Sequence, residues 1–293
     1  MATRETISGF ASPFMPVRVV LVLFLLVLQG GLTGHAGAAG DLLVAPTRLV
    51  LEGRDRTAEV SLVNKGTEAT IYRISIIEKE MTEDGRFVNL APDQAAEGSA
   101  KTMIRFAPRK IRLVPNQPQT VRVVLRKSRN LAAGEYRSHL LFRAVPQNAG
   151  ANSVESNGPA RGIAINLTPI YGVTIPVIVR HGKTEAHAAI DRVALEAASD
   201  KRGPGLRVSI GRNGTRSLFG DLRVSVVEGN KPGDTVGAVS GVAVYVPNRS
   251  RSVRLPITPA LATRLAGRAV HVEYVEQTAR GESVLASKRL VVR

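Results

Sequence analysis

Short segments in which apolar and polar residues alternate follow one another along most of the chain after residue 40. They are separated by turns rich in Gly, Asn, Asp and Pro, such as residues 64–66 and 211–214. A period of two is typical of strands that bury one face, and many short strands at close spacing are typical of a β-sandwich. The pattern therefore predicts an all-β protein. Only residues 259–265 indicate a short helix, because Leu261 and Leu265 lie four positions apart.

One local motif bears on the type of sandwich. Leu131, Gly134 and Tyr136 have the spacing of a tyrosine corner, in which a Tyr at the start of strand F bonds back to the preceding turn. This motif is typical of immunoglobulin-like sandwiches. An ordinary turn followed by a core Tyr has the same spacing, so both interpretations stay open.

The longest extended run covers residues 162–180 and follows a polar loop at 147–160. The apolar residues of this run share one face of a strand: Ile163, Ile165, Leu167, Tyr171, Val173, Ile175, Val177 and Val179. Such a strand is several times longer than the usual five to six residues. One sandwich cannot cover all of it, so we expect its first part to project or to be covered by something else.

The first forty residues have the order of a secretory signal peptide. Arg4 and Arg18 precede an apolar run, which is followed by small residues at 36–38. The apolar run is about half as long as the roughly 20 residues that a membrane-spanning helix needs, so a retained anchor is the weaker alternative. We therefore expect residues 1–40 to be removed after export.

The mature chain is long enough for two domains of ordinary size. Residues 41–180 are expected to form the first domain, residues 181–185 a linker, and residues 186–293 a second β-sandwich domain. The second domain is predicted from the alternating runs that resume near Ala188.

Composition limits the chemistry. The chain has no Cys, which excludes disulfides, Cys-ligated metals and a thiol nucleophile. Forty Lys and Arg against 24 Asp and Glu give a net charge of +16. Because Arg122, Arg137, His139 and Arg143 alternate with apolar residues, we expect these basic side chains on the solvent faces of strands. A dedicated polyanion site is the alternative, and a nucleic acid is not an expected partner of an exported protein.

No catalytic constellation is evident. The His residues show no metal-ligand spacing, and no Gly-rich phosphate loop is present. Ser138 precedes His139, but neighbours in a strand point to opposite faces and cannot act as nucleophile and base. We therefore expect neither an enzyme nor a metal, a cofactor or a small-molecule substrate.

Six segments occur in a characteristic order: VAPTRLV at 44–50, VSLVN at 60–64, the run at 104–124, GEYR at 134–137, AVP at 144–146 and VTIPVIVR at 173–180. In this order and spacing they resemble the PapD-like periplasmic pilus-assembly chaperones, and the likeness extends over nearly all of the mature chain. The resemblance implies two immunoglobulin-like β-sandwich domains in a boomerang arrangement. It also implies a periplasmic chaperone that binds pilus or fimbrial subunits and delivers them to an outer-membrane usher.

In this family the long G strand completes a subunit that lacks its last strand, a mode called donor-strand complementation. By resemblance, Ile163, Ile165 and Leu167 are the donor residues. They follow the polar loop and share one face. The alternative is that all three belong to the core, because parity alone does not distinguish a projecting edge from a buried one.

The family also anchors the C-terminal carboxylate of the subunit with an Arg of the first strand and a Lys of the G strand. Arg48 matches the Arg, but the Lys position falls at or near Pro176, and no Lys lies between Lys127 and Lys183. This departure puts the two-cation anchor in doubt. It indicates a divergent branch, such as the archaic-type chaperones, or a relative with another client.

The resemblance further implies an ion network between the domains. Glu135 and Arg180 match two of its members, and Glu276 is the nearest acidic candidate in the second domain. Glu273 could serve instead, and either could be an ordinary surface charge. Such a network would set the angle between the domains more than it would add stability, because desolvation offsets much of the attraction.

Two other functions stay open. One is a structural or adhesive β-sandwich protein of the envelope, for which the long strand would provide a permanent partner edge. The other is a basic module that binds an anionic glycan or lipopolysaccharide. A chaperone should be isolated with small β-rich subunits, whereas a glycan binder should be isolated alone and be released by salt.

Overall fold

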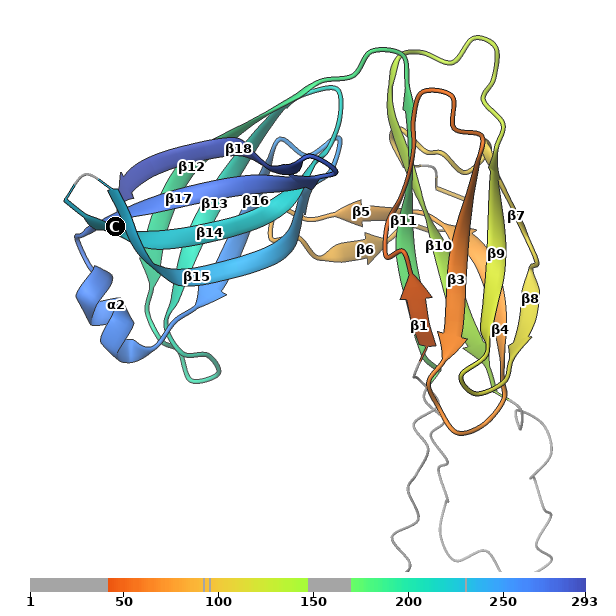
Figure 1. Cartoon of the computed structure of the whole chain (residues 1–293), viewed down its shortest axis with the longest axis horizontal. Helices are drawn as coiled ribbons and strands as arrows, with labels where there is room; N and C mark the ends of the chain where they lie inside the picture. The colour runs from red at the N-terminus through yellow and green to blue at the C-terminus, as the bar shows by residue number, and fades with distance from the viewer. Residues whose placement is uncertain (1–41, 92, 95, 147–169, 230) are drawn as a thin grey trace, which may run out of the picture. The chain divides into compact units, whose positions relative to one another are not determined.

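A computed structural model describes residues 42–91, 93–94, 96–146, 170–229 and 231–293 (Figure 1). Residues 39–293 belong to one compact unit. The expected signal peptide and the donor residues Ile163, Ile165 and Leu167 lie outside the described residues. No helix in the described ranges is both long and apolar enough to cross a membrane.

The first sandwich has two sheets (Figure 1). One contains, in spatial order, β1 (Leu42–Ala45), β3 (Thr57–Asn64), β9 (Pro118–Leu125) and β7 (Ile104–Ala107). The other contains β2 (Leu49–Leu51), β11 (Gly172–His181), β10 (Gly134–Val145), β4 (Thr70–Ile77) and β8 (Lys110–Leu113). The first strand is divided between the sheets, since β1 pairs antiparallel with β3 and β2 pairs parallel with β11. This order is that of an immunoglobulin-like sandwich, which confirms the expected fold class.

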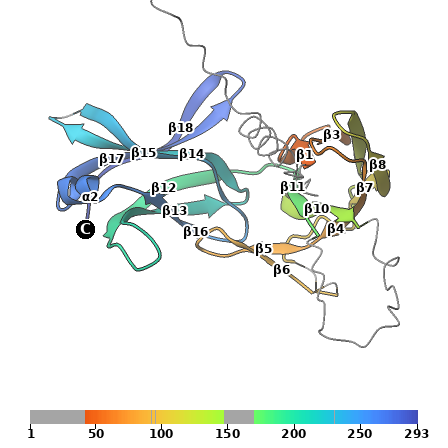
Figure 2. The same ribbon diagram turned by 90° about the horizontal axis from the view of Figure 1, so that it is seen from below.

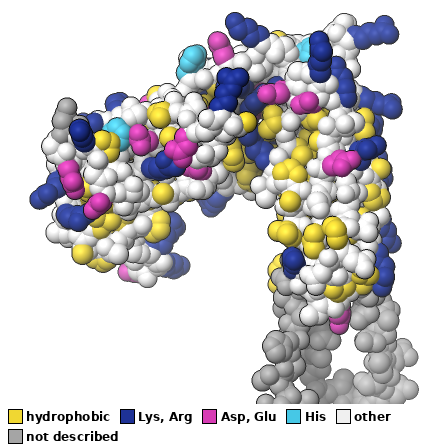
Figure 3. Space-filling model, in the orientation of Figure 1, with side chains coloured by type: hydrophobic (Ala, Val, Ile, Leu, Met, Phe, Trp, Pro, Cys, Tyr) yellow, Lys and Arg dark blue, Asp and Glu magenta, His cyan; other side chains and the backbone are white. Residues whose placement is uncertain are grey.

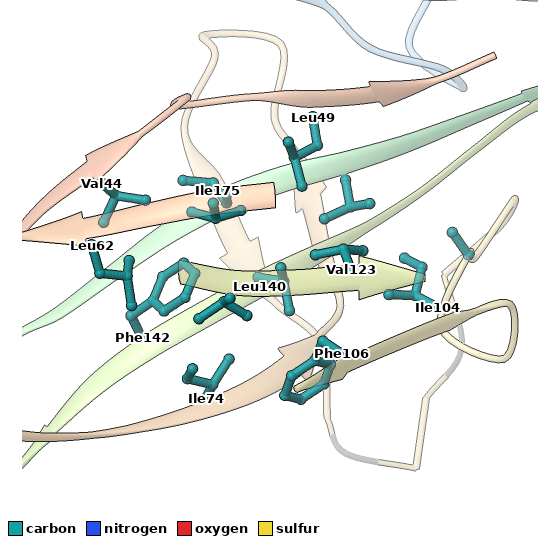
Figure 4. Packing of buried hydrophobic residues seen from close by; sticks show 14 of the residues in the cluster. Val44, Leu49, Leu62, Ile74, Ile104, Phe106, Val123, Leu140, Phe142 and Ile175 are labelled. Atoms are coloured by element: carbon teal, nitrogen blue, oxygen red, sulfur yellow. The ribbon is translucent and has the colours of Figure 1, made fainter. Parts of the chain in front are cut away.

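Alternation explains the core between these sheets. Side chains at every second position of β9, β10 and β11 point inward and are fully or almost fully buried, as Figure 4 shows for several of them: Val121, Val123, Leu140, Phe142, Ile175 and Val177. The expected tyrosine corner is also present, because the Tyr136 hydroxyl donates to the carbonyl oxygen of Ala132 over 3.0 Å.

The second sandwich begins at β12, after β11 has ended at His181. Its three-stranded sheet contains β12 (Ala186–Glu196), β13 (Gly205–Gly214) and β16 (Ser250–Pro256). Its four-stranded sheet contains β15 (Lys231–Val244), β14 (Leu218–Glu228), β17 (Ala269–Thr278) and β18 (Gly281–Val291). The expected helix is α2 (Pro259–Leu265), which buries Ala262 and Leu265 and is capped by the Thr258 side chain. These elements enclose a separate apolar core.

A hairpin formed by β5 (Lys79–Met81) and β6 (Phe87–Asn89) extends from the first sandwich to the second. Figures 1 and 2 both draw it next to β16. The Ser252 backbone N–H donates to the Glu83 carbonyl over 2.8 Å, and Asn248 Nδ2 donates to the Met81 carbonyl over 2.7 Å. The hairpin therefore contacts the second sandwich, and its Phe87 ring packs against His139 on the outer face of β10.

Candidate functional site

Arg48 directly precedes β2, the short strand that lies beside β11. The parallel register places Leu49 opposite Val177 and Val50 opposite Ile178. Arg48, which is expected to hold a carboxylate, thus lies next to β11. This strand is the described part of the long strand that is expected to pair with the client. This proximity depends on β2, whose three residues are too few to be recognised by alternation.

The guanidinium of Arg48 is surrounded by side chains of the second sandwich. Its Cζ lies 4.4 Å from the centroid of the Phe219 ring, and a side-chain hydrogen bond joins it to Tyr245. Two of its nitrogens, Nε and Nη2, are buried without a hydrogen-bond partner. Burial lowers the pKa of Arg48, but a guanidinium keeps its charge at any physiological pH.

A second guanidinium approaches Tyr245 from β10. Arg137 lies opposite Ile178, and its Cζ is 4.3 Å from the centroid of the Tyr245 ring. Its Nη2 donates weakly to the Lys79 carbonyl over 3.4 Å, whereas Nη1 is buried without a partner. A cavity of about 150 Å³ adjoins this side chain and is lined also by Glu135.

A third guanidinium belongs to Arg251 of β16. Its Nη1 donates to the Ala243 carbonyl over 2.7 Å, and its Nε is buried without a partner. It packs so closely under the hairpin turn that a side chain at Gly85 would meet it at 2.5 Å. A buried N–H without an acceptor costs about 1–3 kcal/mol. Three such guanidiniums near one tyrosine therefore form a site suited to an anion.

The structure corrects one expectation about the basic residues. Arg122 and Arg143 are exposed as expected, but Arg137 is only partly accessible and His139 is 2% exposed. Their strand face is covered by the hairpin, since the Phe87 ring packs against His139 with 5.3 Å between centroids. The other Lys and Arg side chains on the face in Figure 3 are distributed over both sandwiches, consistent with solvated strand surfaces.

His139 is buried in a state unsuited to base catalysis. Burial, together with the positive charges of Arg137 and Lys79, lowers its pKa to about 3. Neither ring nitrogen has a hydrogen-bond partner. Ser138 points to the opposite face, where its hydroxyl donates to Glu78 over 2.7 Å. No cluster of metal-ligating side chains occurs among the described residues.

Glu135 and Arg180 form the ion pair that the resemblance implied, with 3.0 Å between Nε and Oε2. Arg180 also pairs with Glu52 over 2.9 Å. Burial by itself would lower the pKa of Arg180. The hydrogen bonds to Glu52 and Glu135 outweigh that effect, so the pKa is raised.

The residue of the second sandwich that contacts Glu135 is Ser217, not Glu276. The Ser217 backbone N–H donates to Glu135 over 3.1 Å, and its hydroxyl donates to the same carboxylate. Within the described ranges no hydrogen bond or ion pair joins Glu276 to Glu135 or Arg180, and Glu273 contacts His271 instead. A single serine carries no sequence signal for this role.

The position of the expected Lys is occupied by Pro176, which lies opposite His139 in the β10–β11 pair. The nearby Lys127 donates to the backbone carbonyl of Arg180 over 2.9 Å. The outward face of β11 thus has no cationic side chain at this position. The guanidinium of Arg137, two residues along on the neighbouring strand, projects from the same face.

The described part of the long strand shows which way its side chains point. Ile175, Val177 and Val179 are buried in the first core. Directly before β11, Ile170 and Tyr171 are 56% and 49% exposed. The role of the donor residues stays a prediction.

No protein-family model and no curated protein matches the chain. Among solved structures it is similar to the YadV chaperone, at 12% identity and a TM-score of 0.43 over 85% of this chain and 100% of that chain. It is similar to the CupB2 chaperone of Pseudomonas aeruginosa, at 12% identity and a TM-score of 0.41 over 86% and 100%. It is also similar to the Salmonella enterica complex of the SafA pilin with the SafB chaperone, at 14% identity and a TM-score of 0.42 over 86% and 97%.

Each of these structures is a chaperone or contains one, and the third includes a pilin. Their identities and TM-scores are low.

Proposed function

We propose that this protein is a periplasmic chaperone that binds pilus or fimbrial subunits by donor-strand complementation. The observation that carries the proposal is Arg48, whose guanidinium is buried beside β11 with two nitrogens lacking an acceptor. A carboxylate at the end of an incoming strand supplies two oxygens in the plane that such a fork requires. Paired along β11, that strand would bring its C-terminus to Arg48.

The long strand supplies the second half of the proposal. Ile163, Ile165 and Leu167 have the same parity as the buried Ile175 and Val177, so in a continuous strand they would present the same face. Beyond the edge of the chaperone's own sandwich, this face would fill the open core of a client. Main-chain bonds would give affinity, and the alternating side chains would give the fit.

The cellular setting belongs to the same proposal. Residues 1–40 act as the signal peptide, residues 41–180 and 186–293 are the two domains, and residues 181–185 link them. The mature chaperone passes its subunits to an outer-membrane usher. It carries out no catalysis and needs no cofactor.

Co-purification tests this function. The full chain is expressed with short exported β-rich proteins encoded beside its gene, and periplasmic extracts are isolated through a tag on the chaperone. We expect one-to-one complexes that persist in high salt, because strand pairing and apolar contacts are not screened. Isolation of the protein alone, with salt-released glycan, would contradict the proposal and support an anionic-glycan binder.

A further inference from the structure

Tyr245 is the side chain on which guanidiniums of the first sandwich converge. It directly follows β15 of the second sandwich and is 5% exposed. Arg137 stacks over its ring, while Arg48 is hydrogen-bonded to it. Phe87 of the hairpin lies 6.0 Å from its ring centroid. The ring therefore has a defined position between charged and aromatic neighbours.

This group of side chains contains hydrogen-bond donors without acceptors. Arg48 leaves Nε and Nη2 unpaired, and Arg137 leaves Nη1 unpaired. A phenol that accepts a bond from a guanidinium still has its own proton to donate. In the described part of the chain, that proton of Tyr245 has no acceptor. The charges of Glu135, Glu78 and Glu80 act on these guanidiniums, but none of the three carboxylates accepts a hydrogen bond from the unpaired nitrogens.

The nearest buried carboxylates are already engaged. Glu135 is bound by Arg180 and Ser217, and Glu78 accepts bonds from Ser99 and Ser138. Both attract Arg137 through their charge, but neither accepts a hydrogen bond from the unpaired nitrogens of Arg48 and Arg137. A buried polar group without a partner needs an explanation, and an external anion provides one.

We propose that Tyr245 is a direct ligand of the client's C-terminal carboxylate, and that its hydroxyl acts with Arg48 in place of the missing Lys. This inference rests on the proposed function, because it takes the anion to be the end of a polypeptide strand. Arg137 is a positioning residue, which holds the phenol ring by stacking on it. The carboxylate is then recognised by both sandwiches, since Arg48 belongs to the first and Tyr245 to the second.

The chemistry of the hydroxyl suits this role. Burial raises the pKa of Tyr245, although the neighbouring arginines oppose the change, so the phenol stays protonated and can donate at any physiological pH. A neutral donor also avoids the cost of burying another charge beside three guanidiniums.

The test uses two N-acetylated peptides of the same alternating Val and Thr sequence, one with a free C-terminal carboxylate and one with a C-terminal amide. Their dissociation constants are measured by NMR on the full mature chain labelled with ¹³C at tyrosine Cζ. We expect the wild type to prefer the carboxylate peptide and to show a shifted Tyr245 resonance. Tyr245→Phe should reduce that preference about tenfold, as expected for one lost bond to a charged group.

Tyr136→Phe is the matched control, because it removes a hydroxyl that bonds to Ala132 within the first sandwich. It should leave the carboxylate preference unchanged. Arg137→Gln should reduce the preference for the carboxylate peptide a few-fold, because the stacking on Tyr245 is lost. This variant provides a second measurement if Tyr245→Phe does not fold. An unchanged preference in folded Tyr245→Phe, or displacement of the peptide by an equal concentration of inorganic phosphate, would overturn the proposal.

The failures of the two proposals are distinguishable. Ile165→Asp alters the donor strand and should not change the carboxylate preference for the short peptides. If Ile165→Asp leaves subunit capture intact while Tyr245→Phe still lowers the preference, the donor-strand function is wrong and the carboxylate site stands. If subunit capture depends on Ile165 but the preference is independent of Tyr245, the present inference is wrong and the chaperone function stands.

Discussion

Glu135 and Arg180 lie directly opposite each other on β10 and β11 and form an ion pair with 3.0 Å between Nε and Oε2. The Glu135 side chain is 1% exposed, and Ser217 of the second sandwich donates two hydrogen bonds to it. The buried carboxylate of Glu135 therefore accepts hydrogen bonds from Arg180 of the first sandwich and from Ser217 of the second. Its loss would leave donors of both unsatisfied.

The variant Glu135→Gln should lower the free energy of unfolding by about 1–3 kcal/mol, because Arg180 keeps Glu52 as a charged partner but loses its buried one. Urea denaturation of the mature chain measures this loss. The control is Glu59→Gln, which breaks the exposed pair with Arg122 and should cost less than about 1 kcal/mol. Equal losses in the two variants would show that burial of Glu135 has no energetic weight.

His139 should make stability depend on pH. Its pKa falls from 6.5 to about 3 in the folded protein, mainly through burial. Because the unfolded chain binds the proton and the folded chain does not, His139 contributes stability that is fully present above about pH 6.5 and is lost progressively as the pH falls toward 3. The slope from this group is at most about 1.4 kcal/mol per pH unit.

Urea denaturation at pH 7 and pH 5 compares the wild type with His139→Phe, in which an aromatic ring still meets Phe87. The drop in stability between the two pH values should be larger in the wild type. A parallel drop in both proteins would assign the pH dependence to other groups.

Ile165→Asp should abolish subunit capture while leaving the fold of the chaperone intact, because a carboxylate in the client groove would lack a partner. Asn166→Asp is the matched control, since it places the same charge one residue further on the opposite face of a strand. Protection of a co-expressed subunit from degradation measures capture. Wild-type protection by Ile165→Asp would show that the donor-strand assignment is wrong.

Arg48→Ala should strongly reduce the yield of the complex, and Arg48→Lys should restore it only in part, because an ammonium cannot bind a carboxylate bidentately. Deleting the last residue of the subunit should do no further harm in the Arg48→Ala background. This double-mutant cycle measures whether the two groups act on each other. Additive losses would mean that Arg48 does not hold the carboxylate.

Local pattern was sufficient for much of the fold. Alternating residues such as Val121 and Val123 are buried between sheets as the period of two predicts, and Tyr136 bonds to its own preceding turn. The helix at Pro259–Leu265 was also predictable. These features depend on residues close together in the sequence, so the pattern around each position contains most of the information.

The family resemblance identified Arg48, Glu135 and Arg180, and the structure places Glu135 against Arg180. It indicated Glu276 as the partner from the second sandwich, where the structure has Ser217. A carboxylate can be satisfied by an N–H and a hydroxyl as well as by a cation, and a serine with this role resembles any other serine in the sequence.

Only the tertiary structure brings together Arg48, Arg137 and Tyr245. In β10 the alternation correctly puts Arg137 and His139 on the outer face, but it does not show that a hairpin and a second sandwich cover that face. Whether a polar side chain meets water or a buried partner depends on contacts between residues distant in the chain, which no local period encodes. For that reason the strands were predictable from residue order, whereas the unsatisfied donors around Tyr245 emerged only from packing.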